Sequence, residues 1–270
     1  RLTGHAPYKD VIVQTARSLC TRFRPKAGVI QSWNLWKRLR EKGWLCPVII
    51  DNMMNLELLF EATRLSGDNS FRQIALSHIK NTLKNHFRPN GSCYHVVDYD
   101  PETGQVRHKQ THQGYSDESA WSRGQAWAIY GFTMAYRYTK DERYLRQAMK
   151  TFDYMRRHPN MAKDGIPYWD MDVPDIQKEP RDASSAAIMA SALFEMSDYV
   201  TEKQSKDYLK YARKLLKSLS GTTYKARLGE DGGFLLKHSV SSKPGNSEID
   251  VPLNYADYYF LEALVRNKKH

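Results

Sequence analysis

The sequence predicts an all-α fold built from stacked helical hairpins, and three observations support this prediction. Helical periodicities or helix caps follow one another along the chain, and no segment reads as a convincing strand. A helix that opens with aspartate recurs at intervals of 66, 65 and 68 residues. Helices that are apolar nearly all round alternate with amphipathic ones, as expected for the inner and outer layers of stacked helix pairs.

The expected helices are separated by short segments rich in Pro, Gly and Asn. They cover residues 8–23, 51–66, 69–87, 117–139, 141–158, 182–199, 203–220 and 250–267. Those opening with Asp51, Asp117, Asp182 and Asp250 are the apolar ones, so we expect these aspartates at or near the starts of inner helices. Closing such pairs into a ring gives an inner barrel wrapped by an outer layer, and six pairs would need about 390 residues. We therefore expect the chain to lack its first helices.

Composition and charge limit the classes of partner. The chain has 270 residues, of which 41% are hydrophobic, so it can bury a large core. It has no run of eighteen apolar residues, and its first ten residues hold no apolar segment suited to a signal peptide, so we expect no membrane partner. The formal charge of +11 suits an acidic partner. Because Lys and Arg are scattered and no nucleic-acid module is recognisable, we expect an acidic sugar rather than nucleic acid.

The cysteines do not indicate a metal site or a disulfide framework. Cys20, Cys46 and Cys93 are odd in number and lack metal-ligand spacing, so we expect free, buried thiols. The sequence also has no nucleotide or metal motif. We therefore expect no cofactor and no metal.

Asp51 is a carboxylate in an apolar stretch, PVIIDNMMNLELLF at residues 47–60. One interpretation is a helix cap, because Asp accepts the free N–H groups of a first turn. The other is a catalyst, because burial raises the pKa of a carboxyl group toward that of a useful proton donor. The residues alone leave both interpretations open, and one side chain could serve in both roles.

The segment THQGYSDESAWSRGQAWAIYGF, residues 111–132, combines aromatic, basic and amide side chains near a helix start. On a helix, Trp121 shares a face with Gln125, whereas Arg123 shares another face with Trp127. Tryptophans of this kind can simply be core residues. Together with Arg and Gln they also suit an acidic sugar, since aromatic faces stack on sugar rings and Arg binds a carboxylate with two N–H groups.

Four segments together resemble the unsaturated glucuronyl hydrolases, family 88 of the glycoside hydrolases. These are IIDNMMNLELLF, HQGYSDESAWSRGQAWAIYGF, PYWD and SEIDVPLNYADYYFLEAL, in this order. The resemblance covers nearly the whole chain from about residue 8 and implies an (α/α)6 barrel, here a single catalytic toroid over residues 1–270. It also implies a bacterial enzyme, in the periplasm or the cytoplasm.

The resemblance implies a reaction on the fragments that polysaccharide lyases leave, which end in a 4,5-unsaturated uronic acid and can be sulfated. The enzymes of this family hydrate the C4=C5 double bond, and the product then rearranges and loses the rest of the sugar chain. Water does not attack the anomeric carbon, so the carboxylate-separation rule for retaining and inverting glycosidases does not apply.

The same resemblance assigns roles to residues of this chain. Asp51 matches the general acid/base. The matches around the substrate are His95, Gln113, Arg123 and the aromatic residues Trp121, Trp127 and Trp33, with Trp36 as the alternative to Trp33.

One departure from the family, the role of one loop and two alternative functions stay open. The family's second aspartate would lie about one repeat before Asp51, outside this chain. The polar loop 238–250 is either a plain connection or binds a carboxylate or sulfate through Ser239, Ser241, Ser242 and Lys243. The alternative functions are an unsaturated rhamnogalacturonyl hydrolase with the same barrel and a non-catalytic helical-repeat protein that binds acidic glycans.

Overall fold

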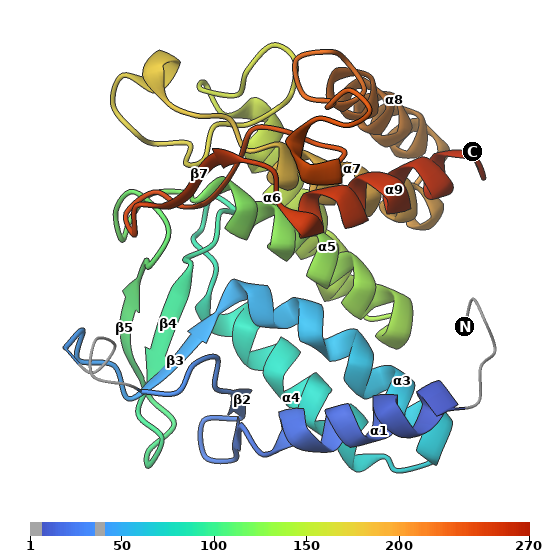
Figure 1. Cartoon of the computed structure of the whole chain (residues 1–270). Coiled ribbons are helices and arrows are strands. Elements are labelled where there is room, and N and C mark those ends of the chain that lie inside the picture. The colour runs from blue at the N-terminus through green and yellow to red at the C-terminus, as the bar shows by residue number, and fades with distance from the viewer. Residues whose placement is uncertain (1–6, 36–40) are drawn as a thin grey trace. The chain divides into compact units, whose positions relative to one another are not determined.

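The computed structural model describes residues 7–35 and 41–270, which form two compact units. The first unit takes the chain up to Phe87 and also includes Val96–Gln110. The second consists of Arg88–His95 and Thr111–His270. Figure 1 shows the elements of both along the chain.

In the part of the first unit that the structure describes, three helices combine with short antiparallel strands. Its helices are α1 (Pro7–Cys20), α3 (Leu56–Ser66) and α4 (Ser70–Asn85), and the 3-10 turn η1 (Ile50–Asn55) precedes α3. Its strands are β1 (Phe23–Arg24), β2 (Val29–Ile30), β3 (Cys46–Ile49), β4 (Val96–Tyr99) and β5 (Val106–Gln110). The strands pair as β1–β2 and as β3–β4–β5. The helix α3 ends at Gly67, whose φ of 78° is favourable for a residue without a Cβ atom.

The second unit is a layered set of helical hairpins. Its helices are α5 (Ser122–Thr139), α6 (Glu142–Arg157), α7 (Ala183–Met196), α8 (Glu202–Leu219) and α9 (Asn254–Asn267). Short 3-10 turns are η2 (Ile176–Lys178), η3 (Ser197–Tyr199) and η4 (Asp231–Gly233), and β6 (Ser239–Ser242) pairs with β7 (Ser247–Val251). The helix α7 contacts both α5 and α9, while α6 contacts α5 and α8 contacts α7.

The predicted alternation of buried and amphipathic helices is confirmed for α5 to α8. Every residue of α7 is buried, and α5 is buried from Ser122 to Ala135. The helices α6 and α8 each bury one face only. The prediction is wrong for α9, because its buried residues form a single stripe while Tyr258, Leu261 and Val265 are exposed.

The aspartates of the repeat differ in their positions. Asp182 is the N-cap of α7 and accepts a hydrogen bond from the Ser184 N–H at 3.1 Å, as expected. Asp117 lies before α5, and its carboxylate accepts from the Thr111 N–H at 2.8 Å. Asp250 lies in β7 with a φ of 57°, beside His238 Nδ1 at 2.7 Å. Neither Asp117 nor Asp250 caps a helix, because the N-cap residues of α5 and α9 are Trp121 and Leu253.

The expectation of no strands is also corrected by the pairings just described. The strands escape detection because they are two to five residues long, too short to show an alternating pattern. None of the described helices is long and apolar enough to cross a membrane. Cys20, Cys46 and Cys93 form no disulfide, as predicted; Cys46 and Cys93 are buried as expected, whereas Cys20 is only half-buried, which corrects the prediction for that residue.

Candidate active site

Trp121 lies immediately before α5 and anchors the site in the second unit. It is the N-cap residue of α5, is 2% exposed, and pairs with Asp170 in an isolated antiparallel bridge. The His95 ring packs on the Trp121 ring, with centroids 4.3 Å apart and an interplanar angle of 37°. The structure therefore brings together two residues that are 26 positions apart in the sequence.

The contacts of His95 determine its neutral tautomer. Its Nδ1 atom accepts from the backbone N–H groups of His112 at 3.1 Å and Gln113 at 3.2 Å. An accepting nitrogen needs its lone pair, so the proton of the neutral ring lies on Nε2. The loop that carries Gln113 thus makes His95 a hydrogen-bond donor through Nε2.

Arg123 and Gln113 converge on the strand β6. The Gln113 Nε2 atom donates to the Ser241 carbonyl oxygen at 2.7 Å, and Arg123 Nη2 donates to the same oxygen at 2.6 Å. Arg123 Nη1 donates to the Val240 carbonyl and lies 3.2 Å from Asp182 Oδ2. Since Arg123 is 2% exposed, its charge is compensated inside the protein.

The guanidinium of Arg123 also lies over two aromatic rings. It is 4.5 Å from the centroid of Trp121 and 5.4 Å from that of Tyr255. The counter-ion of Arg123 is Asp182, whereas the nearby Glu118 pairs with Arg88. Asp182 therefore has two roles, as the cap of α7 and as the counter-ion of Arg123.

Trp127 lies on a different side of α5 from Trp121, as the helical spacing predicts. Its ring packs against Tyr255 at 6.2 Å and Tyr259 at 5.3 Å, both from α9. Because Arg123 contacts Tyr255 as well, this tyrosine links the two tryptophans into one aromatic cluster. Tyr255 was not singled out from the sequence, although its segment PLNYADYYF is part of the resemblance.

Gln125 holds the segment that carries His95. Its Oε1 atom accepts from the Cys93 N–H at 2.8 Å, and its Nε2 atom donates to the Cys93 carbonyl at 3.0 Å. Both polar ends of the amide are thus used by the backbone of one residue. Gln125 therefore positions the segment before His95.

Asp170 holds the loop that carries Gln113, and sequence reasoning missed it. Its Oδ2 atom accepts from the Tyr115 N–H at 2.9 Å and the Ser119 hydroxyl at 2.7 Å, and its Oδ1 atom accepts from the Asp172 N–H at 3.0 Å. Burial raises the pKa of Asp170. A Cβ atom on Gly114 would lie 3.0 Å from Asp170 Oδ2, so glycine allows this close approach.

Asp51 and Trp33 belong to the first unit. Asp51 lies in the first turn of η1, directly after β3, and its Oδ2 atom is buried from solvent. The N-cap residues of η1 and α3 are Ile49 and Asn55, so Asp51 is the N-cap of neither. The turn is fixed on both sides of Asp51, by the Ile49 N–H bonded to Ser32 Oγ at 2.8 Å and by Asn52 Nδ2 bonded to the Ile30 carbonyl at 2.7 Å.

Trp33 stacks on Trp44, with ring centroids 5.6 Å apart and an interplanar angle of 24°. Trp44 is 2% exposed and donates from Nε1 to Gln110 Oε1 at 2.6 Å. Trp33 is thus supported from within its own unit. Trp36, the alternative to it, lies outside the described residues.

The loop 238–250 forms the β6–β7 hairpin, and the side chains of Ser239, Ser242 and Lys243 bond within the protein, with Ser242 Oγ accepting from the Gly245 N–H at 3.2 Å. Ser239 is buried, and its Oγ accepts from the Ser184 N–H at 3.2 Å. Lys243 forms an ion pair with Glu179, which also accepts from Trp169 Nε1 at 2.6 Å. A cavity of about 320 Å³ adjoins this pair, lined by Tyr115, Trp169, Val173, Pro174, Glu179, Lys243 and Pro244.

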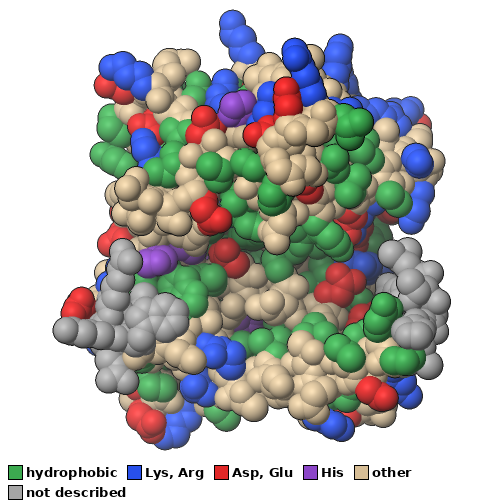
Figure 2. Space-filling model, in the orientation of Figure 1, with side chains coloured by type: hydrophobic (Ala, Val, Ile, Leu, Met, Phe, Trp, Pro, Cys, Tyr) green, Lys and Arg blue, Asp and Glu red, His purple; other side chains and the backbone are tan. Residues whose placement is uncertain are grey.

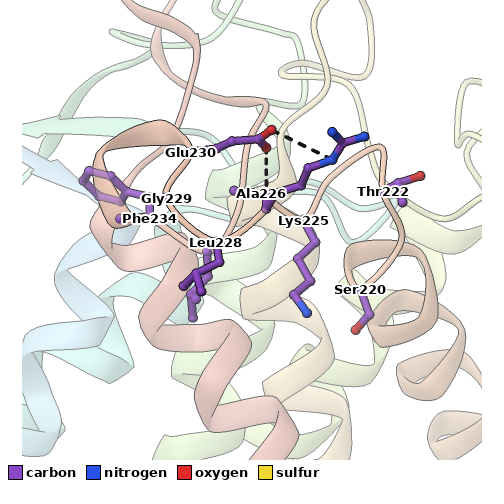
Figure 3. Close-up of a pocket in the computed structure, with 11 residues that line it drawn as sticks. Ser220, Thr222, Lys225, Ala226, Leu228, Gly229, Glu230 and Phe234 are labelled. Carbon is purple, nitrogen blue, oxygen red and sulfur yellow. Dashed lines mark hydrogen bonds and ion pairs between the residues drawn. The ribbon is translucent and has the colours of Figure 1, made fainter.

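A second cavity, of about 560 Å³, lies under the loop that follows α8 (Figure 3). Its lining runs from Ser220 to Leu235 and contains none of the site residues predicted from the sequence. Within the described residues, no group of three His, Cys, Asp or Glu side chains could hold a metal ion.

Comparison with known proteins identifies a family. The model of Glycosyl Hydrolase Family 88 matches residues 2–270. An unsaturated glucuronyl hydrolase of Formosa agariphila is 50% identical over 261 residues, which are 97% of this chain and 64% of that protein. An unsaturated chondroitin disaccharide hydrolase of Streptococcus agalactiae is 35% identical, covering 98% of this chain and 66% of that protein. The chain thus spans a little less than two thirds of the length of these relatives.

Solved structures agree with these matches. A crystal structure of an unsaturated glucuronyl hydrolase specific for heparin superposes with a TM-score of 0.94 and 45% identity, covering 100% of this chain and 70% of that one. The unsaturated glucuronyl hydrolase of Bacillus sp. GL1 gives a TM-score of 0.90 and 31% identity, covering 98% and 69%. Both are (α/α)6 barrels, which confirms the fold class predicted from the sequence.

Proposed function

The chain belongs to glycoside hydrolase family 88, and from this premise we propose that the protein is an unsaturated glucuronyl hydrolase. Its substrates are glycosaminoglycan fragments whose non-reducing end is a 4,5-unsaturated uronic acid. We further propose that residues 1–270 belong to one catalytic toroid. The observation that carries the proposal is the linked set of His95, Gln113, Trp121 and Arg123, which joins donors and aromatic faces in one cluster.

Asp51 is the general acid and then the general base in this proposal. Its carboxyl proton goes to C4, which leaves positive charge at C5 beside the ring oxygen. Water then adds to C5 and returns a proton to Asp51, so the net change is addition of water across the C4=C5 bond. The resulting hemiketal opens, and the remaining sugar leaves. The buried Oδ2 atom and the fixed backbone on both sides of Asp51 suit a group that must act in one position.

The other residues bind and orient the unsaturated ring. His95 offers an Nε2–H donor, and Trp121 and Trp127 supply aromatic faces that stack on sugar and exclude water. Gln113 is oriented by its bond to the Ser241 carbonyl. Arg123 acts by fixing that same carbonyl, so that its effect on the substrate passes through Gln113 and the β6–β7 hairpin. Trp33, in the first unit, is assigned to substrate binding by the resemblance to the family alone.

The decisive variant is Asp51→Asn in the full-length protein. We expect at least about a hundredfold loss of turnover, the lower range for loss of a general acid/base, with the fold retained. Turnover is followed as the loss of ultraviolet absorbance of the conjugated double bond, with unsaturated disaccharides from chondroitin, hyaluronan and heparin.

Asp68→Asn is the matched control. Asp68 is exposed and accepts from the Ser70 N–H at the start of α4, so its loss costs at most about 1 kcal/mol and leaves turnover intact. Near-normal activity of Asp51→Asn would remove Asp51 from the chemistry. An unmodified protein that turns over none of the three disaccharides would refute the proposed function.

A further inference from the structure

The outer face of α8 carries a stripe of positive charge. Six of its eighteen residues are exposed lysine or arginine: Lys203, Lys206, Lys210, Arg213, Lys214 and Lys217. At 3.6 residues per turn they fall within about 100° of the helix circumference, and at 1.5 Å per residue they span about 21 Å. The buried residues of α8, such as Tyr208 and Leu215, lie on the opposite side.

Little negative charge neutralises this stripe. The acidic residues of α8 are Glu202, which pairs with Lys206, and Asp207, which pairs with Arg156 of α6. Among the described residues, no Asp or Glu side chain forms an ion pair with the other five cations of the stripe, although Arg213 donates to Asn267 Oδ1 at 3.2 Å and to the His270 oxygen at 3.0 Å.

The stability of the helix does not account for the stripe. Six pairs of its cations are three or four positions apart, and like charges at this spacing destabilise a helix. Lys203 and Lys206 lie near the N-terminus of α8, where the helix dipole disfavours cations. Glutamine at these positions would keep the helix and remove the repulsion. The fold does not explain this row of positive charges, whereas a partner that bears negative charge would.

We propose that the α8 stripe is an exosite for an acidic polysaccharide chain, separate from the site that acts on the chain end. Regularly spaced carboxylates and sulfates complement a row of cations, and binding would hold the enzyme near a polymer that supplies its substrate. Figure 1 shows α8 well apart from the hairpin that contains β7, and Figure 2 shows Lys and Arg side chains at the edge of the molecule where α8 lies.

Other polyanions fit the surface less well. Single-stranded nucleic acid binds through aromatic platforms, and the exposed large hydrophobic side chains of the described chain include none on α8. A membrane-surface helix must offer its apolar face to lipid, whereas the apolar face of α8 is buried. The choice of a glycan rests on the proposed function, but the stripe itself does not.

The test measures binding of size-fractionated long heparin to the full-length protein at several salt concentrations. The stripe variant carries Lys203→Gln, Lys210→Gln, Lys214→Gln and Lys217→Gln. The control variant removes the same charge from exposed lysines of other helices or their ends, as Lys9→Gln, Lys80→Gln, Lys84→Gln and Lys268→Gln. We expect the stripe variant to bind at least about tenfold more weakly than the control, with a shallower dependence on salt.

Two further readouts make the result specific. The stripe variant should melt at or above the temperature of the unmodified protein, since repulsion within α8 is removed, and should turn over an unsaturated disaccharide normally. Equal affinity of stripe and control variants would overturn the exosite. If the unmodified protein binds duplex DNA as tightly as heparin, and the stripe variant loses that binding, the assignment to glycan would be overturned. Failure of the unmodified protein to turn over disaccharides would count against the proposed function but would leave the binding result unchanged.

Discussion

Replacing Arg123 by lysine tests whether this buried arginine holds the β6–β7 hairpin. Its guanidinium reaches the Asp182 carboxylate and the carbonyl oxygens of Val240 and Ser241. A lysine keeps the charge, but a single ammonium on a straight stem cannot reach all three acceptors in the geometry of the planar fork. At least one acceptor then stays buried without its donor.

The size of the effect follows from these contacts. A hydrogen bond to a charged group contributes about 1.5–3 kcal/mol, and a buried group left unsatisfied costs about 1–3 kcal/mol. Loss of one or two such contacts therefore lowers the free energy of unfolding by about 2–4 kcal/mol. For a protein of this size each kcal/mol corresponds to about 2–4 °C, so we expect the melting temperature to fall by about 5–10 °C.

A thermal unfolding scan of Arg123→Lys, with Arg143→Lys as the control, measures this fall in melting temperature. Arg143 pairs with Asp141 on the surface, with 63% of its side chain exposed, so its replacement should cost less than about 1 kcal/mol. We also expect a lower kcat for Arg123→Lys, because Gln113 is oriented by the same Ser241 carbonyl. A melting temperature within about 1 °C of the unmodified protein, together with a raised KM, would refute this reasoning and indicate that the fork contacts substrate directly.

The remaining predictions concern buried groups. Asp170→Asn places an amide donor where the carboxylate accepts three donors. We expect kcat to fall at least about tenfold, and a urea titration to show a free energy of unfolding lower by about 1–3 kcal/mol. If neither value changes, Asp170 does not hold the loop. Burial lowers the pKa of His78 to about 3 and that of His86 to about 4, against 6.5 when exposed. The folded protein then binds fewer protons than the unfolded chain, so stability is full above pH 6.5 and falls as the pH drops toward 4, by about 2 kcal/mol per histidine at pH 5. Melting temperatures measured from pH 8 to 4 should show this fall, and a flat profile would contradict it.

The helices could be predicted well because their patterns are long. The helices α6 and α8 each carry more than four turns of amphipathic sequence, and the expected ranges 141–158 and 203–220 lie within a residue of the observed ends. The small-residue run of α7 correctly indicated burial on all sides. The strands could not be predicted, because a segment such as Cys46–Ile49 is paired only through contacts with a distant partner, Val96–Tyr99.

The site could be predicted only in part, for a similar reason. Resemblance located Arg123 and Gln113, but the sequence could not reveal that both donate to one carbonyl of Ser241. It treated Asp182 as a cap, which is correct, and could not indicate that the same carboxylate lies beside Arg123, because 59 residues separate them. Asp170 is the last residue of PYWD, one of the segments of the resemblance, but it was given no role. A single Asp in a short loop has no local pattern that distinguishes a buried acceptor from an exposed turn residue.

The contacts at the start of α5 explain why the seven residues WSRGQAW are a specific signal of the family. The polar and aromatic positions in WSRGQAW point around the helix, and their side chains contact two distant segments, residues 93–95 and the strand β6. Trp121 packs on His95, Arg123 holds Ser241, and Gln125 holds the backbone of Cys93. A substitution at any of these positions therefore moves a segment far away in the sequence as well as the residue itself. The motif joins three parts of the chain, and under the proposed function these are the parts that surround the substrate ring, so folding and chemistry would constrain the same residues.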